Sequence, residues 1–428
     1  RPTGPDGPIP AWSWSDSAGT VIRRNLTPEQ ASVEAAEQFA RRALAMAPAD
    51  TRTQALLLGI LMWRDLVASG WDKPLPTGPG SAYDLALALG PDLTRTTLEL
   101  ALERGNAAAT LTSLAVLAQT GSRNELLAPE SPLLSALMVP ESRVQFAAAE
   151  TILQLDPAQP FAGASRVVQV LARALSSSPL RKCVVIDPNN ERGSGIAGMM
   201  ASLGYDSEVA PTGQKGFQIA AGEGNVELVL LHLNTVQWDL SQTVANLRAD
   251  PRTAQIPLAV YGPPAMRGAA RRQVGQTPLL GYVDDAGDLG RMQMQLEPLL
   301  GGRAVPPLTE AQRQEQIVAA AYWLQHIASG QRTRIFPLGP AEAALSEAAG
   351  RPVVARDAVV ALGAFGTPAV QERLAQVGLT NQFGVAIQGA ALAQLSFHIQ
   401  RYGRLLSDAT ARDLARAYEA ATSAELRT

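Results

Sequence analysis

The sequence predicts a multidomain α plus α/β protein, in which helical-repeat segments flank a doubly wound parallel sheet. Apolar residues recur at helical spacing over 27–178 and again over 303–428, whereas short β-rich runs alternate with helical stretches over 179–302. The composition is 46% hydrophobic but only 5% aromatic, and alanine and leucine dominate it, which favours helices packed through small side chains. A length of 428 residues suits about two to four domains.

Residues 1–26 are predicted to form an extended segment, because they are rich in proline and glycine. The two tryptophans of this segment, Trp12 and Trp14, suggest that it docks on another surface. Thr27-Pro28 then reads as a helix start, with a threonine cap and proline at the first helical position. This helix and the next one, at 51–68, resemble a tetratricopeptide-type unit. Further helices are expected at 84–89, 92–103, 106–119, 131–138 and 164–176.

The stretch 132–156 resembles a HEAT repeat, with an outer helix, a short turn and an alanine-rich inner helix. The matching positions are Glu141, Arg143, Val144, Ala147, Ala148, Ile152 and Leu153. A second match, 356–363, lies in the C-terminal segment, where helices are expected at 309–328, 340–348, 355–364, 367–377, 381–401 and 407–421. One such hairpin cannot bury its apolar face alone, so the resemblance implies stacked hairpins with an extended surface for a protein partner.

The segment 179–302 is predicted to be an α/β domain with a parallel sheet covered on both faces. Its five strands are expected at 182–187, 206–210, 226–233, 256–261 and 279–283. Helices are expected near 193–203, 213–222, 240–249, 264–274 and 287–300. The chain therefore divides into an extended segment (1–26), a TPR/HEAT-like domain (27–178), the α/β domain (179–302) and a HEAT-like domain (303–428).

Residues 181–302 resemble a response-regulator receiver domain, which implies a flavodoxin-like fold with its site at the carboxyl ends of the strands. Receivers hold magnesium with two acids after the first strand, and an aspartate that ends the third strand accepts the phosphoryl group. A hydroxyl after the fourth strand and a lysine after the fifth neutralise the phosphoryl charge. The corresponding positions here are Asp187, Pro188, His232, Gly262 and Asp285. Four of the five are changed, so the resemblance implies a degenerate domain that cannot be phosphorylated on aspartate.

Two other interpretations of this domain stay open. Asp187, His232 and Asp285 could together hold a divalent metal, or they could be a remnant pocket in which a neighbouring acid holds the histidine. The glycines at 193, 195 and 198 match a dinucleotide-binding spacing, but five residues separate them from Asp187. Small residues at that place are expected to allow close helix packing, and we predict no cofactor.

Three arginines, Arg267, Arg271 and Arg272, form a basic cluster on the fourth helix of the α/β domain. They and Trp71, in a proline-rich loop, are the candidate residues for binding a protein partner. A net charge of −3 without a basic stripe argues against nucleic acid. No run of about 18 apolar residues exists to span a membrane. The single cysteine, Cys183, lies in an apolar run and is expected to be a buried thiol.

The sequence contains no recognisable set of catalytic residues, and neither an enzymatic activity nor a small-molecule substrate is predicted. The favoured interpretation is a protein–protein interaction scaffold with a receiver-like domain that is not phosphorylated. One alternative is a structural protein of the cell envelope that self-assembles, and another is a signalling protein switched by a ligand or metal in the remnant pocket. The chain starts at Arg1, which fits an envelope protein if a signal peptide has been removed and a cytoplasmic one otherwise.

Overall fold

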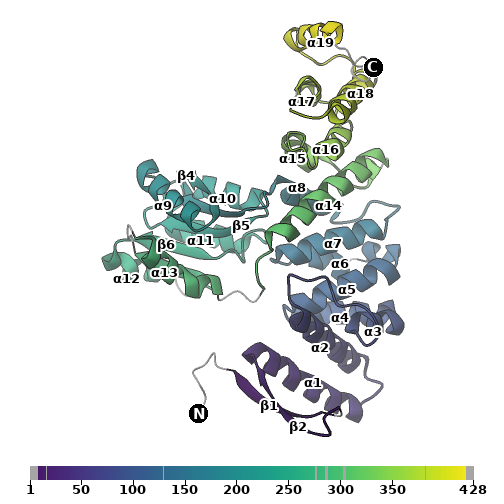
Figure 1. The fold of residues 1–428 in the computed structure, drawn as a ribbon, viewed down its shortest axis with the longest axis vertical. Coiled ribbons are helices and arrows are strands. Elements are labelled where there is room, and N and C mark those ends of the chain that lie inside the picture. Colours follow the sequence, from purple (N-terminus) through teal and green to yellow (C-terminus); the bar gives the residue numbers. More distant parts are fainter. Residues whose placement is uncertain are drawn as a thin grey trace. The chain divides into compact units, whose positions relative to one another are not determined.

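The helices and strands follow the sequence prediction closely (Figure 1). The computed structural model describes residues 8–15, 17–128, 130–274, 277–284, 288–301, 305–330, 332–380 and 382–420. They fall into two units: Arg1–Val139 with Glu150–Asp156, and Pro140–Ala149 with Pro157–Thr428. The second unit contains both the α/β part and the helices that follow it in the chain. The four sequence-based domain boundaries stay predictions.

The first unit is a β-hairpin followed by helices. Its elements are β1 (Ile9–Ser15), β2 (Thr20–Leu26), α1 (Pro28–Met46), α2 (Thr51–Ser69), α3 (Ala82–Leu89), α4 (Pro91–Glu103), α5 (Ala107–Thr120), the 3-10 turn η1 (Arg123–Leu127) and α6 (Pro132–Ala136). Helix α7 (Ser142–Gln154) contributes residues to both units. Thr27 caps α1 as predicted: its hydroxyl accepts from the Gln30 amide, and the Gln30 side chain accepts from the Thr27 amide. Leucines such as Leu58, Leu98 and Leu114 are fully buried between the helices.

Residues 9–15 and 20–26 of the N-terminal segment are extended, as predicted, but they are also paired. Strands β1 and β2 run antiparallel, with Ile9 opposite Leu26 and Ser15 opposite Thr20. The connection ends at Gly19, whose φ of 59° suits glycine. The sequence between the two strands, Asp-Ser-Ala-Gly at 16–19, lacks the Asn-Gly or Asp-Gly pair that marks a two-residue hairpin, so the pairing was not predicted.

The α/β part of the second unit contains a five-stranded parallel sheet. Its elements are β3 (Arg181–Ile186), α9 (Asn190–Ser202), β4 (Tyr205–Ala210), α10 (Gly213–Gly222), β5 (Val226–His232), α11 (Leu240–Ala249), β6 (Leu258–Gly262), the turn η2 (Pro264–Met266), α12 (Arg267–Val274), β7 (Leu280–Asp284) and α13 (Leu289–Gly301). The strands are ordered β4-β3-β5-β6-β7. The chain therefore enters at β3 and winds outward in both directions, as in doubly wound sheets.

Alternating side chains of the strands form a core on each face of the sheet. On one face Val184, Ile186 and Leu231 pack with Val244 of α11 and Ile219 of α10. The opposite core joins the strands to α9 and α13 through Cys183, Val185, Leu230, Ile196, Met200, Met292 and Leu296. Cys183 is fully buried, as the sequence analysis expected, and burial raises the pKa of its thiol. Both faces are covered, which agrees with the near-continuous apolar runs of the strands.

The remaining elements of the second unit are helical. They are α8 (Ala164–Ser176), α14 (Glu310–Ser329), the turns η3 (Arg332–Arg334) and η4 (Gly339–Ala341), α15 (Glu342–Ala348), α16 (Ala355–Leu362), α17 (Pro368–Leu379), α18 (Val385–Tyr402) and α19 (Asp408–Ala420). Helices α8 and α14 pack together, and α16 packs on α14. A buried pair of side chains joins α17 to α18. The side-chain amide of Gln371 donates to Nδ1 of His398 at 3.0 Å and to the carbonyl oxygen of Gly403 at 2.7 Å.

Candidate functional site

The carboxyl edge of the sheet brings three of the predicted pocket residues into one neighbourhood. Asp187 follows β3, His232 ends β5 and Gly262 ends β6. Tyr261, next to Gly262, connects the first two: its hydroxyl donates to Asp187, and its ring meets the His232 ring edge-on with the centroids 5.3 Å apart. The fifth predicted residue, Asp285, lies outside the described residues.

Asp187 is a buried carboxylate whose two oxygens accept several hydrogen bonds. Arg192 donates from Nε to Oδ2 and from Nη2 to Oδ1, both at 2.7 Å. The Asn189 amide donates to Oδ1 at 2.8 Å, and the Tyr261 hydroxyl donates to Oδ2. Burial raises the pKa of Asp187, but the hydrogen bonds from Arg192 and Tyr261 outweigh burial and hold it below the ordinary value. The group is therefore a charged, fully engaged carboxylate.

The other predicted site residues that the structure describes are Pro188, His232 and Gly262. Nδ1 of the buried His232 accepts from the Asn234 amide at 3.2 Å. A Cβ on Gly262 would lie 2.0 Å from Cδ2 of Leu233, so a serine or threonine there requires Leu233 to move. Pro188 is exposed next to Asp187 and offers no carboxylate. Burial and the bond to Asp187 raise the pKa of Tyr261, whose phenol thus stays protonated.

The geometry does not favour a metal or a dinucleotide in this domain. No group of three His, Cys, Asp or Glu side chains suited to a metal occurs among the described residues. At Asp187 the protein's own guanidinium covers both carboxylate oxygens, so a divalent cation would have to displace Arg192. The glycine-rich run lies inside helix α9 rather than in a loop before it, as expected. A Cβ on Gly193 would lie 2.8 Å from Cγ1 of Val209, so this glycine serves close helix–strand packing.

Arg192 and Tyr261 belong to this cluster but were not predicted from the sequence. Helix α9 begins three residues earlier than predicted because Asn189 caps it, accepting from the Arg192 amide at 3.0 Å. The cap places Arg192 in the first turn, facing Asp187. For Tyr261 the signal was present, since a tyrosine at a fully buried strand position needs an acceptor for its hydroxyl.

The candidate partner-binding residues are found in different settings. Arg267 is held in place by Asp284, with Nη2 and Oδ1 2.8 Å apart, and its guanidinium lies over the ring of Tyr282. Arg271 and Arg272 are exposed on helix α12. Trp71 is half-buried in the turn after α2, in the first unit. The arginine cluster thus reduces to two side chains directed to solvent.

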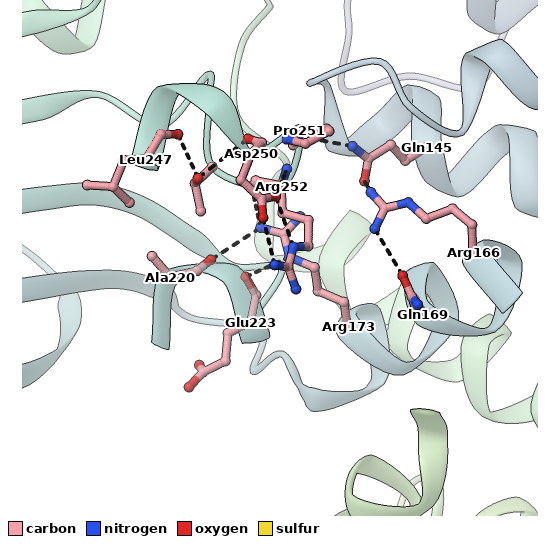
Figure 2. A network of polar contacts seen from close by, with 11 residues as sticks. Gln145, Arg166, Gln169, Arg173, Ala220, Glu223, Leu247, Asp250, Pro251 and Arg252 are labelled. Carbon is pink, nitrogen blue, oxygen red and sulfur yellow. Dashed lines mark hydrogen bonds and ion pairs between the residues drawn. The ribbon is translucent and has the colours of Figure 1, made fainter. Parts of the chain in front are cut away.

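A further set of arginines, not predicted from the sequence, attaches the α/β part to helix α8 (Figure 2). The guanidinium of Arg173 donates to the carbonyl oxygens of Arg252 at 2.7 Å and Glu223 at 3.2 Å. Asp250 in turn binds the Arg252 side chain at 2.7 Å. Burial, with the nearby charges of Arg252 and Arg166, lowers the pKa of Arg173 to about 10, so it is still charged at neutral pH. The loops that receive these bonds precede β5 and β6.

Helix α14 makes a second attachment through Arg313. Its Nη1 lies 2.7 Å from Oε1 of Glu227 on β5, and its Nε donates to the carbonyl oxygen of Pro179 at 2.6 Å. Both charged side chains are more than 90% buried. Arg313 is one turn before the buried Ile317, on the apolar face of α14. An arginine that interrupts an apolar face is the sequence signal that could have revealed this contact.

Two further findings bear on what this arrangement can do. Among the residues described, no helix combines the length and apolar character needed to cross a membrane, in keeping with the sequence prediction. Among the described residues at this edge of the sheet, the Asp187 carboxylate binds Arg192 and the Tyr261 hydroxyl, and the His232 ring packs against the Tyr261 ring. Comparison with protein-family models and with curated proteins yields no match to any family or relative.

Proposed function

We propose that this chain is a non-catalytic scaffold for protein–protein interaction, in which helical repeats hold a receiver-like domain that does not accept a phosphoryl group. The observation that carries the proposal is the contact of Arg192 with both oxygens of Asp187. In receivers the corresponding acid helps to bind magnesium. Here the positive charge beside the Asp187 carboxylate is the guanidinium of Arg192. Because this guanidinium is bound to both carboxylate oxygens, Asp187 cannot also bind a metal, and Arg192 cannot also bind a phosphoryl oxygen.

The resemblance to a receiver is supported by the sheet as well as by the sequence. The strand order and the helices on both faces are those of a flavodoxin-like domain. The third strand ends in His232 where a receiver has its phosphoaccepting aspartate. Phosphoryl transfer needs positive groups that neutralise the charge gathering on the phosphoryl oxygens. The guanidinium of Arg192 is such a group, but it is already bound to Asp187.

A scaffolding role is supported by how the α/β part is held. Arg173 and Arg313 attach it to α8 and α14 through bonds to backbone carbonyls and to Glu227. These bonds lie at the amino ends of the strands and leave the α12 surface exposed. A domain fixed in this way presents a constant surface, which suits docking better than switching.

The proposal predicts no response to a phosphoryl mimic. Hydrogen–deuterium exchange of peptides covering 185–195 and 228–236 should be unchanged by magnesium with beryllofluoride, because Arg192 occupies both oxygens of Asp187 and His232 stands at the phosphoacceptor position. An active receiver in the same buffer serves as the positive control. Protection of either peptide would overturn the claim that this domain is silent.

The proposal also predicts that α12 binds an acidic partner surface. Replacing Arg271 and Arg272 by glutamate should weaken capture of the native partner by about tenfold without changing the thermal unfolding of the chain. Arg267 is left intact because it is bound to Asp284. The matched control is Arg291→Glu, an exposed arginine on α13 of the same domain. Equal capture by both variants, measured by quantitative pull-down from the native cell, would contradict an α12 docking surface.

A further inference from the structure

The N-terminal hairpin is a sheet of only two strands within the described residues, and each strand has one open edge. Two-stranded hairpins are marginally stable alone and gain from additional strands or from packing on a helix. An open edge offers unpaired amide and carbonyl groups to another strand. The two open edges of this hairpin differ in the charges that their strands carry. This difference indicates which edge pairs with another strand.

One face of the hairpin carries exposed apolar side chains. Trp12 and Trp14 are 67% and 63% exposed, and Val21, opposite Trp14 on β2, is 53% exposed. Alternate residues of a strand share a face, so both tryptophans point to the same side. The other residues of β1 at 11, 13 and 15 are half-buried on the opposite side. Large aromatic side chains gathered on an exposed surface are typical of an interaction site.

The charges distinguish the two edges. Strand β2 carries Arg23 and Arg24. Arg24 is ion-paired with Glu34 of α1, with Nη2 and Oε1 2.9 Å apart, but pairing β2 antiparallel with its own copy would still bring the two Arg23 side chains close together. Charged side chains of this kind protect a sheet edge from unwanted pairing. Strand β1, with the sequence Ile-Pro-Ala-Trp-Ser-Trp-Ser, carries no charge at all. The β1 edge can therefore meet an identical strand without electrostatic cost, and the β2 edge cannot.

We propose that β1 pairs antiparallel with β1 of a second copy of this chain, forming a four-stranded sheet across a two-fold axis near Ser13. In this register Trp12 of each copy lies opposite Trp14 of the other, and Ala11 of each copy lies opposite Ser15 of the other. Aromatic pairs directly across an antiparallel ladder stabilise it, and small residues allow close approach on the other side. The register also excludes Pro10, which has no amide hydrogen to donate. The inference is independent of the proposed function, since it concerns another surface.

The first test is the mass of the full chain in solution. Sedimentation equilibrium should show a concentration-dependent dimer that becomes a monomer in the double variant Trp12→Lys/Trp14→Lys. The matched control is Asn25→Lys, an exposed position on β2, which should still form the dimer. A monomer at every concentration would overturn the proposal, and so would a dimer that survives the double lysine variant.

The second test locates the axis and does not depend on the lysine variants. Residues directly opposite in an antiparallel ladder have Cα atoms about 4.5–5.5 Å apart, which a disulfide can bridge. Ser13→Cys should therefore form a covalent dimer under mild oxidation, whereas Asn25→Cys should not. The native Cys183 is fully buried and does not compete. Equal cross-linking of both variants, or binding of the tryptophans to phosphatidylcholine vesicles without self-association, would show that a second copy is not the partner.

Discussion

Replacing Arg313 by methionine is expected to lower the free energy of unfolding by about 3–5 kcal/mol. The guanidinium of Arg313 lies 2.7 Å from Glu227, and both side chains are more than 90% buried. Methionine keeps much of the volume of arginine but leaves the Glu227 carboxylate without this countercharge. It also removes the donor to the carbonyl oxygen of Pro179. Urea unfolding followed by circular dichroism measures the loss.

Two further variants separate the buried charge from the change of side chain. The double variant Arg313→Met/Glu227→Leu should recover much of the lost stability, because no charge is then buried alone. Arg404→Met makes the same substitution in an exposed pair, whose Arg404 Nη2 and Asp408 Oδ1 are 2.7 Å apart, and should change stability little. A double variant as unstable as Arg313→Met would mean that packing, rather than charge, determines the effect.

Replacing Asp187 by alanine should cost about 3 kcal/mol or more at neutral pH. The substitution leaves the buried Tyr261 hydroxyl without its acceptor and removes both acceptors of the Arg192 guanidinium. Asp187→Asn keeps the shape of the side chain and should cost less. Arg192→Met provides the complementary variant, since it removes the cation and leaves the carboxylate. A negligible effect of Asp187→Ala would contradict the structural role assigned to this carboxylate.

The same carboxylate predicts a pH dependence of definite sign. The pKa of Asp187 is lower in the folded chain than the ordinary value, so the folded state favours the charged form. The stability gained in this way is present above about pH 4, the ordinary pKa of aspartate, and is lost as pH falls through the lowered folded pKa. The difference in unfolding free energy between the native chain and Asp187→Asn should therefore narrow as urea unfolding is repeated from pH 7 toward pH 3. A constant difference would contradict this linkage.

Periodicity located the elements better than it located the contacts between them. The five strands and their helices were predictable because short β-rich runs alternate with helical stretches, and three of these runs, β3, β5 and β6, are mostly apolar. The candidate site was predictable only in part, because the ends of parallel strands bring Asp187 and His232 together whatever else surrounds them. The role of Arg192 could not be predicted, because it depends on the capping residue Asn189, which sets the start of α9 about one turn earlier than expected.

The attachments of the α/β part could not be predicted for a different reason. Arg173 and Arg313 are single residues that bind partners as far as 79 and 134 positions away in the chain. No local pattern specifies such a pairing, and an arginine in a helix is more often at the surface. The hairpin of β1 and β2 illustrates the same limit, because the proline and glycine content indicated an extended chain but not the strand that it pairs with.

The acceptors at these attachments have a consequence for sequence variation. Arg173 donates to the carbonyl oxygens of Glu223 and Arg252, and Arg313 donates to that of Pro179. Every amino acid supplies a carbonyl oxygen, so the side chains at 223, 252 and 179 can change during evolution while these bonds persist. The arginines themselves do not tolerate substitution in this way, because even lysine lacks their planar, forked donor geometry. Selection at these attachments should therefore be strict for the donor arginines and weak for the loop residues whose carbonyl oxygens accept the bonds.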